Sequence, residues 1–189
     1  HRTIFGLDIS GVSMPFGFRI LGNKMDVTAS RLALLAGAGS LIILLAAFGF
    51  QYIGDLAPCK LCLWQRYPHG LVIVLAVIFA RVKHRLLLWL GGVASLSTAG
   101  IAAYHSGVEQ KWWQGPDTCT SGSIDGLSTE QLIAQIMASP IIRCDEIAWS
   151  FLSLSMASWN LIASLLLAAL WFYAWRIWPR PDISASIHS

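Results

Sequence analysis

Long uncharged runs dominate the pattern of hydrophobic and polar positions along the chain. The runs 32–50 and 86–104 contain no charged residue, and neither does the stretch between Glu146 and Arg176. A helix of about 20 apolar residues, rising about 1.5 Å per residue, crosses the hydrocarbon core of a bilayer. The three runs therefore predict membrane-spanning helices.

A fourth apolar run is too short to cross a membrane by itself. It extends only from Tyr67 to Ala80, well short of the roughly 20 residues that a span needs. A helix that begins near Leu61 instead reaches this length. The earlier start places Cys62 and Arg66 in the first turns of a membrane helix.

These runs predict an all-α fold, an integral membrane four-helix bundle. The composition agrees, because 56% of the 189 residues are hydrophobic and only 12% are charged, about half the share of a typical soluble domain. The transmembrane domain should occupy residues 31–178, between an N-terminal segment, 1–30, and a C-terminal tail, 179–189. Its four spans are expected at about 32–51, 61–80, 86–104 and 150–175.

Basic residues predict the orientation of the bundle. An even number of spans puts both termini on one side, where most of the Lys and Arg residues lie: Arg2, Arg19, Lys24, Arg31, Arg81, Lys83, Arg85, Arg176 and Arg180. The other side has only Lys60, Arg66, Lys111 and Arg143. Since loops rich in Lys and Arg stay in the cytoplasm, both termini should be cytoplasmic, and the loops 52–60 and 105–148 should face the opposite side.

Two further features of the chain limit its functions. The net charge of +3, with no basic cluster, predicts no nucleic-acid partner. Residues 1–24 lack the long apolar core of a signal peptide, and Met25 is a plausible native start. We predict no function for this N-terminal segment.

The long loop 105–148 should carry one short amphipathic helix at 127–139. Ser128 and Gln131 have the spacing of a capping box, and the apolar residues that follow share one face: Leu132, Ile133, Ile136 and Met137. Such a helix lies either along the membrane surface or against its own domain, and both interpretations stay open.

All four cysteines fall on the side of the membrane opposite the termini. Cys59 and Cys62 form a CxxC pair at the start of the second span, whereas Cys119 and Cys144 lie in the long loop. An even number of cysteines confined to a non-cytoplasmic face is typical of an oxidising compartment. In a bacterium that compartment is the periplasm.

Two interpretations of the cysteines explain them only in part. A zinc site could use Cys59 and Cys62, but Cys119 and Cys144 are too far apart in the sequence to be a second close pair, and no HxxxH or second CxxC completes the ligand set. Structural disulfides would explain the pair in the long loop, where closure is worth about 3 kcal/mol. A CxxC disulfide closes a very small ring and restricts the unfolded chain little, so it is more often catalytic than structural.

A redox couple explains the CxxC pair better. Pro58 is favoured at a helix start, so the pair should occupy the first turn of the second span, where unpaired N–H groups and the helix dipole stabilise a thiolate. Arg66 lies four residues after Cys62, on the same face. An arginine at that depth needs an anion, a polar head group or water, and a quinone carbonyl beside the thiolate would suit it. Snorkelling to the interface is the simpler alternative.

The segment "PCKLCLWQR" (58–66) resembles the first outer-loop motif of the DsbB family, the disulfide bond formation proteins B of bacterial inner membranes. The segment "RCDEIAWSFLSLSMASWN" (143–160) resembles the family's sequence around its last cysteine. The resemblance covers roughly residues 30–178. It implies a multi-pass inner-membrane enzyme that reoxidises a periplasmic thioredoxin-fold thiol oxidase, DsbA-like, and passes the electrons to ubiquinone or menaquinone.

The resemblance also implies roles for individual residues. Cys119 would be attacked by the partner's thiolate, and Cys144, once released, would attack the disulfide at Cys59. Cys62 would then be left as a thiolate that donates to the quinone, with Arg66 supporting the ring.

Two more residues, Trp149 and His105, match positions that the family places near the quinone. Gln65 departs from the family pattern, because an acidic residue is common just before the arginine, and the first span contains no acidic residue. These departures leave the cysteine relay intact but leave open how protons reach the quinone.

Two other functions remain as alternatives. Proteins like vitamin K epoxide reductase also couple loop cysteines to a quinone, but their CxxC follows the loop pair, whereas here it comes first. A membrane scaffold with structural disulfides is the alternative from outside the enzymes.

Overall fold

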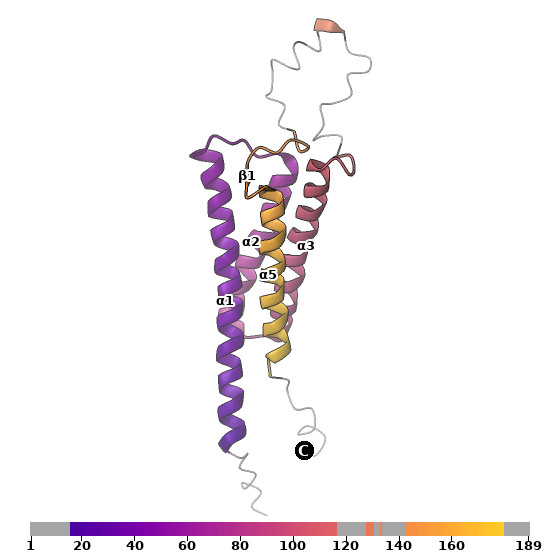
Figure 1. Ribbon diagram of the computed structural model, residues 1–189. Coiled ribbons are helices and arrows are strands. Elements are labelled where there is room, and N and C mark those ends of the chain that lie inside the picture. Colours follow the sequence, from indigo (N-terminus) through magenta and orange to yellow (C-terminus); the bar gives the residue numbers. More distant parts are fainter. Residues whose placement is uncertain (1–15, 117–127, 131–132, 134–142, 180–189) are drawn as a thin grey trace, which may run out of the picture.

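The computed structural model describes residues 16–116, 128–130, 133 and 143–179 (Figure 1). Four long helices dominate it: α1 (Phe16–Tyr52), α2 (Lys60–Val82), α3 (Arg85–Glu109) and α5 (Met156–Ile177). Each contains a segment long and apolar enough to cross a membrane: Lys24–Tyr52, Lys60–Val82, Arg85–Glu109 and Met156–Ile177. The predicted all-α four-helix bundle is therefore confirmed.

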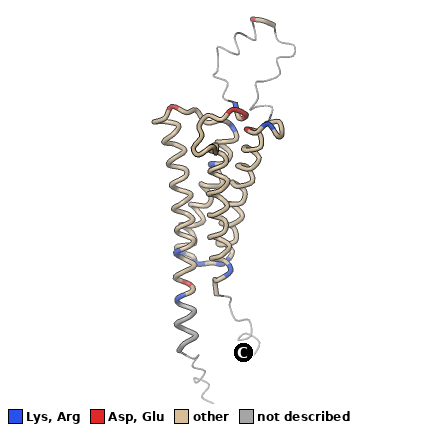
Figure 2. Tube along the Cα trace, viewed as in Figure 1, with Lys and Arg blue, Asp and Glu red and all other residues tan. Residues whose placement is uncertain are grey.

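The helices form a closed ring of neighbours. Helix α1 packs against α2 and α5, and α3 packs against the same two helices. Successive helices run in opposite directions, so α1 begins and α5 ends at the same end of the bundle (Figure 1). Most of the basic residues of the described chain lie near that end (Figure 2): Lys24, Arg31, Arg81, Lys83, Arg85 and Arg176. Lys60, Arg66, Lys111 and Arg143 lie toward the other end.

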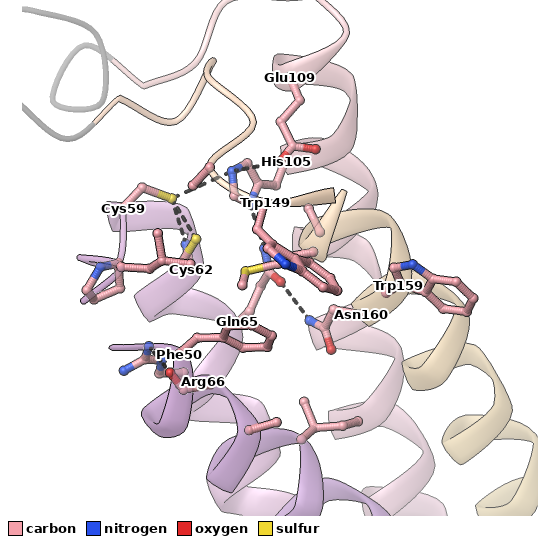
Figure 3. A pocket seen from close by; sticks show the side chains of 18 of the residues that line it. Phe50, Cys59, Cys62, Gln65, Arg66, His105, Glu109, Trp149, Trp159 and Asn160 are labelled. Carbon is pink, nitrogen blue, oxygen red and sulfur yellow. Dashed lines mark hydrogen bonds and ion pairs between the residues drawn. The ribbon is translucent and has the colours of Figure 1, made fainter. Parts of the chain in front are cut away.

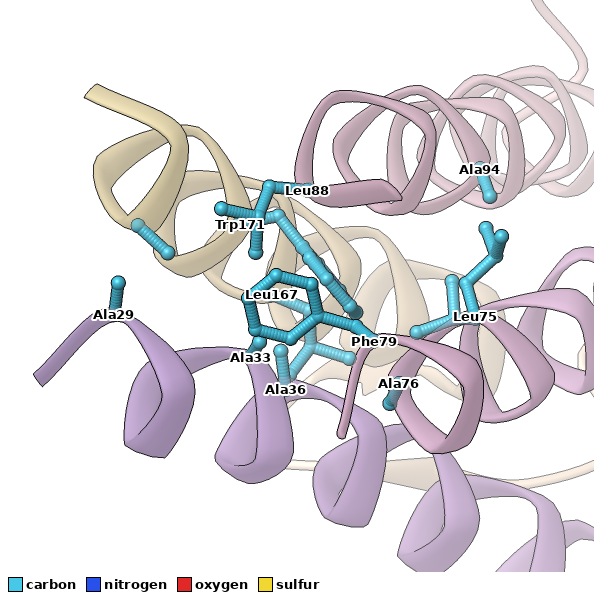
Figure 4. Packing of buried hydrophobic residues seen from close by; sticks show 12 residues of the cluster. Ala29, Ala33, Ala36, Leu75, Ala76, Phe79, Leu88, Ala94, Leu167 and Trp171 are labelled. Atoms are coloured by element: carbon cyan, nitrogen blue, oxygen red, sulfur yellow. The ribbon is translucent and has the colours of Figure 1, made fainter. Parts of the chain in front are cut away.

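Small residues let the helices approach closely in the core. Ala29, Ala33 and Ala36 form a fully buried stripe on α1 (Figure 4). On α3, a Cβ atom added at Gly91 would lie 2.4 Å from the ring of Trp171, which is completely buried. Packing of small residues against large ones is the usual basis of helix association in membranes, where the hydrophobic effect between helices is weak.

The last helix begins later than the expected span at about 150–175. Residues before it form a hairpin of β1 (Ser150–Phe151) and β2 (Leu154–Ser155), with Ser150 opposite Ser155. Leu152 and Ser153 make the turn with φ of 50° and 64°. Glycine or asparagine usually occupies such positions, so the sequence carries no signal for this turn. Ser155 then caps α5 by accepting a hydrogen bond from the backbone N–H of Ser158.

The other helix bounds differ from the expected ones in two places. Helix α1 begins at Phe16, inside the segment 1–30, and α3 continues to Glu109 rather than ending near residue 104. The second extension adds one helical turn that carries His105 and Glu109 toward the cysteines. Most of the helix predicted at 127–139 lies outside the described residues.

Candidate active site

A cavity of about 350 Å³ opens at the end of the bundle where α2 begins (Figure 3). All four helices and the segment before α5 contribute to its wall. Most of the lining is apolar, and examples are Ile43, Leu44, Phe50 and Met156. The polar and charged residues of the lining are Cys59, Cys62, Gln65, Arg66, His69, His105, Glu109, Arg143, Glu146 and Asn160.

The CxxC pair forms the start of α2. Cys59 is the N-cap residue, and its sulfur accepts a hydrogen bond from the backbone N–H of Cys62 at 3.2 Å. The Cys59 thiol in turn donates to the Cys62 sulfur, which lies 2.8 Å away. This hydrogen bond and burial raise the pKa of the Cys59 thiol. Cys59 is therefore the sulfur that retains its proton, and the Cys62 sulfur accepts its hydrogen bond.

The histidine at position 105 completes a group of three potential metal ligands. Its Nε2 atom lies 3.6 Å from the Cys59 sulfur, and the ligand atoms of Cys59, Cys62 and His105 all lie within 4.8 Å of one another. Two thiolates on one zinc ion would be about 3.8 Å apart, given Zn–S bonds of about 2.3 Å and tetrahedral angles. The shorter sulfur–sulfur distance of 2.8 Å fits a dithiol–disulfide couple better than a zinc site.

Cys144 packs beside the CxxC pair although it is far from both cysteines in the sequence. It is completely buried, in a cluster with Cys59, Leu61 and Val108, and Cys62 packs against this cluster. The backbone of Cys144 also contacts the His105 ring. Three of the four cysteines thus meet at one end of the bundle. Cys119 lies outside the described residues.

The carboxylate of Asp145 holds the segment around Cys144 in place. Asp145 accepts hydrogen bonds from the Arg143 guanidinium at 2.8 Å and from Lys111 Nζ at 2.7 Å. These two cations hold the pKa of the Asp145 carboxyl well below its usual range. Because Lys111 follows α3, the clasp formed by Asp145, Arg143 and Lys111 ties the Cys144 segment to the end of that helix.

Arg66 lies in the cavity wall, with part of its charge satisfied by α1. Its Nη1 donates to Gln51 Oε1 at 2.6 Å and its Nη2 donates to the Ala47 carbonyl at 3.3 Å. The guanidinium carbon lies 4.9 Å from the centre of the Phe48 ring. The Nε atom is buried and has no hydrogen-bond partner among the described residues. The hydrogen bonds to Gln51 and Ala47 therefore use two of the five N–H donors of Arg66.

A chain of buried amides and imidazoles continues from His105 into the bundle. Gln65 Nε2 lies 2.9 Å from His105 Nδ1, and Gln65 Oε1 accepts a hydrogen bond from Asn160 at 2.6 Å. Asn160 Oδ1 lies 2.9 Å from His69 Nε2, and His69 Nδ1 lies 3.2 Å from the Ser40 hydroxyl. Buried polar groups need such partners in a membrane, and this network supplies them.

Trp149 forms part of an aromatic rim of the cavity. Its ring centre lies 5.1 Å from that of Phe50 and 6.1 Å from that of Phe151. Its exposed fraction is 37%, so one part of the ring faces outward. Trp149 and His105, which the sequence places near a quinone only by resemblance, thus line the same cavity as Cys62 and Arg66.

Sequence reasoning missed several residues of the cavity and its surroundings. Glu109, His69, Asn160 and Gln51 were not singled out, and Gln65 was noted only as a departure. A signal was present, because Gln65 and His69 are four residues apart on α2, as are His105 and Glu109 on α3, so each pair shares a helix face. Polar residues paired in this way within a span point to the bundle interior.

Comparisons with known proteins agree with this geometry. The sequence model of the family "Disulfide bond formation protein DsbB" matches residues 29–174. Disulfide bond formation protein B of Hahella chejuensis is 29% identical over 142 residues, which cover 71% of this chain and 86% of that protein. Disulfide bond formation protein B 2 of Pseudomonas entomophila is 33% identical over 162 residues, covering 78% of this chain and 91% of its own.

A third relative, disulfide bond formation protein B of a Psychrobacter species, is 33% identical over 153 residues, which cover 74% of this chain and 87% of the relative. No solved structure matches the chain. The family match spans all four helices, and the two cysteine segments that it includes meet at one cavity. The chain belongs to the DsbB family, and it is an oxidoreductase that reoxidises DsbA and passes the electrons to quinone.

Proposed function

We propose that the cavity beside Cys62 is the place where electrons leave this protein for a membrane quinone, either ubiquinone or menaquinone. The observation that carries the proposal is the position of the Cys62 sulfur and Arg66 in the wall of one apolar cavity. A quinone ring is flat and apolar with carbonyl oxygens at its edge, so it needs such a wall and a few placed donors. The Arg66 guanidinium, with its N–H donors and positive charge, suits a carbonyl oxygen.

The quinone, when bound, supplies the acceptor chemistry for two electrons. This chain would hold it with the aromatic rim at Phe50 and Trp149, orient it with Arg66 and His105, and keep bulk water away with the apolar residues of α1 and α5. Cys62 is the proposed electron donor, because it lies in the first turn of α2, where the helix dipole and the Arg66 charge stabilise a thiolate.

Electrons would reach Cys62 through disulfide exchange. A thiolate of the soluble partner attacks Cys119, forms a mixed disulfide and releases Cys144. The Cys144 thiolate then attacks Cys59, forms a bond to it and releases Cys62 as a thiolate. Each exchange forms one S–S bond and breaks one, so the two electrons move inward without loss. Burial of Cys144 beside Cys59 supports the second exchange.

We place the relay on the periplasmic face of the bacterial inner membrane, with both termini in the cytoplasm. The basic residues at the end where α1 begins support this orientation, since cytoplasmic ends carry the excess of Lys and Arg (Figure 2). The proposed partner is a DsbA-like thiol oxidase of the thioredoxin fold. Membrane lipid would contact the exposed apolar faces of the spans.

The test is quinone reduction by the purified protein with a reduced thioredoxin-fold partner. We expect Cys59→Ser and Cys62→Ser each to abolish turnover while the protein is still obtained in normal yield and still folds. Structural disulfides would give the opposite pattern, a lower yield with unchanged specific activity. Turnover that survives serine at either position would disprove the relay.

A further inference from the structure

We propose that Glu109 is the carboxyl group that takes the proton from Cys62 when this sulfur becomes a thiolate, and returns it to the reduced quinone. The inference rests on the proposed quinone site and extends it to the proton route, for which the sequence alone offers no candidate. The observations that support it are the position of Glu109 in the cavity wall and the hydrogen-bond partners of its neighbour His105.

Glu109 is a buried carboxyl at the edge of the cavity. It is the last residue of α3, and its side chain is only 5% exposed (Figure 3). One oxygen lies 3.8 Å from His105 Nε2, and the other accepts a hydrogen bond from the Ser155 hydroxyl. The Ser155 contact fixes the carboxyl against β2, and the His105 ring lies between the carboxyl and the Cys59 sulfur (Figure 3).

No lysine or arginine forms an ion pair with Glu109 in the described part of the chain. The nearby cations have other partners, because Arg143 and Lys111 both bind Asp145, and Arg143 also lies 3.4 Å from the exposed carboxylate of Glu146. Glu109 therefore differs from the other acidic residues around the site. It is buried at the cavity, and it is not held as a permanent anion by a cation.

His105 cannot easily take the thiol proton itself. Asn160 donates to Gln65 Oε1, which leaves the Gln65 amide nitrogen to donate to His105 Nδ1 at 2.9 Å. The neutral imidazole consequently carries its proton on Nε2, the atom that faces the Cys59 sulfur and Glu109. His105 is here a donor, and its Nε2 atom lies between the Cys59 sulfur and the Glu109 carboxyl. Glu109 remains the acceptor.

The other titratable groups around the cavity do not replace Glu109. Helix α2 contributes the Cys62 thiol, which is the proton donor, and Arg66, which is already charged. It also contributes His69, which forms hydrogen bonds with Asn160 and Ser40 deeper in the bundle. The segment before α5 contributes Arg143 and Glu146, which pair with each other. Helix α1 contributes only neutral residues to the lining.

The proton balance closes with one carboxyl. The balance is written for the fully reduced protein, in which Cys59 and Cys62 are both free thiols. In the first step the Cys62 thiol loses its proton to the Glu109 carboxylate, giving a thiolate and a carboxylic acid. In the second step the Cys59–Cys62 disulfide forms and two electrons pass to the quinone. The quinol takes one proton from the Cys59 thiol and one from Glu109, which returns to a carboxylate. Charge and atoms are conserved, and no other acid is needed.

The first experiment needs no quinone. Infrared difference spectra of reduced minus oxidised quinone-free protein should contain the C=O stretching band of a protonated carboxyl. We expect the band to be lost in Glu109→Gln and kept in the exposed control Asp55→Asn. A band that persists unchanged in Glu109→Gln, or no band in the wild-type protein, would overturn the proposal.

The second experiment measures one turnover of quinone reduction by the prereduced protein against pH. General acid–base groups contribute on the order of 100-fold or more, so Glu109→Gln should slow this step about 100-fold and remove its dependence on pH. Glu109→Asp should keep the pH dependence with a smaller loss of rate, which separates proton transfer from a structural role. Equal rates and equal pH profiles in wild type and Glu109→Gln would refute the assignment.

Circular dichroism in detergent serves as the folding control, and the helical signal of Glu109→Gln should match that of the wild type. The two proposals fail differently. If Cys62→Ser still reduces quinone, the proposed site is wrong, whereas if only the Glu109 variants behave like wild type, the site stands and the proton route is wrong.

Discussion

At the scale of single residues, Arg66 shows how a charge is kept inside a membrane helix. Gln51 and the Ala47 carbonyl satisfy two of its nitrogens, and the Phe48 ring lies beside the guanidinium. These contacts come from α1, so the arginine does not need to snorkel to the interface. They also fix the guanidinium in the wall of the cavity.

Replacing Arg66 by His should therefore weaken quinone binding more than the electron transfer itself. A hydrogen bond to a charged group contributes about 1.5–3 kcal/mol, so the apparent KM for quinone should rise about 10- to 100-fold with a smaller change in kcat. Steady-state kinetics over a range of quinone concentrations measure both values. Arg81→His, at the other end of the bundle, is the control and should leave KM unchanged. An unaltered KM in Arg66→His would show that Arg66 does not contact the quinone.

The sequence predicts the residues whose role follows from their neighbours in the chain. Cys59, Cys62 and Arg66 share one short segment, and their placement at the start of a helix follows from the length of the apolar run. Glu109, Gln51 and Asn160 come from the three other helices. Their meeting depends on how each helix is rotated in the bundle, which periodicity in a uniformly apolar helix does not determine.

At the scale of elements, the contact between α3 and α5 depends on a glycine. A Cβ atom at Gly91 would lie 2.4 Å from the Trp171 ring, whereas nothing lies within 4 Å of one added at Gly100 on the same helix. Alanine at the first position must push the buried ring aside, which costs about 1–3 kcal/mol. At the second position alanine should be neutral or stabilise the helix by up to about 1 kcal/mol.

We expect Gly91→Ala to lower the midpoint of thermal unfolding in detergent and Gly100→Ala to leave it unchanged or raise it. Circular dichroism of the two variants and the wild type gives the comparison. If the two alanine variants unfold at the same temperature, close packing at Gly91 does not limit the stability of the bundle.

The Asp145 clasp controls a second element, the segment that carries Cys144. The pKa of the Asp145 carboxyl in the folded protein lies below the unfolded value of about 3.9, so the clasp stabilises the fold above that pH and is lost only as the pH falls through the folded pKa. Across the neutral range its contribution is constant. A change of quinone reduction with pH near neutrality must therefore come from another group.

Removing the charge of Asp145 should expose Cys144 more often. The contacts involve partly exposed side chains and are screened by water, so we expect alkylation of Cys144 in the reduced protein to be about two- to fivefold faster in Asp145→Asn. Mass spectrometry of the labelled cysteine measures the rate. Glu146→Gln, which removes only the more exposed partner of Arg143, should have little effect. Equal rates in Asp145→Asn and wild type would mean that the clasp does not hold the segment.

The sequence predicts some helices and strands of this fold but not others. Apolar length predicts the existence and order of the four helices, and this prediction is confirmed. The hairpin at residues 150–155 is not predictable, because Leu152 and Ser153 adopt a turn that those residue types rarely form. The extra turn of α3 is also missed, since polar residues after Tyr104 resemble the beginning of a loop.

At the scale of the whole molecule, the two ends of the bundle carry different kinds of residues. Cys59, Cys62, Cys144 and the cavity lie at the end where α2 begins, and most of the described basic residues lie near the other (Figure 2). A bundle of this kind gives a soluble partner access to one face only. The proposed orientation makes that face periplasmic.

Reporter fusions at the C-terminus test the orientation. With the end of α5 in the cytoplasm, a fused green fluorescent protein should be fluorescent and a fused alkaline phosphatase inactive. Fusions at Trp112, in the loop after α3, should give the reverse pattern. Active phosphatase at the C-terminus would place the cysteines in the cytoplasm and contradict the proposed relay.

The central claim is that the Cys62 sulfur touches a quinone ring, and visible absorbance of the quinone-loaded protein tests it most directly. A thiolate in contact with a quinone gives a charge-transfer band. We expect this band in Cys59→Ser, where Cys62 has lost its cysteine partner, and its absence in Cys62→Ser loaded with the same amount of quinone. A band that survives in Cys62→Ser, or no band in Cys59→Ser at any pH at which the thiol ionises, would contradict the account.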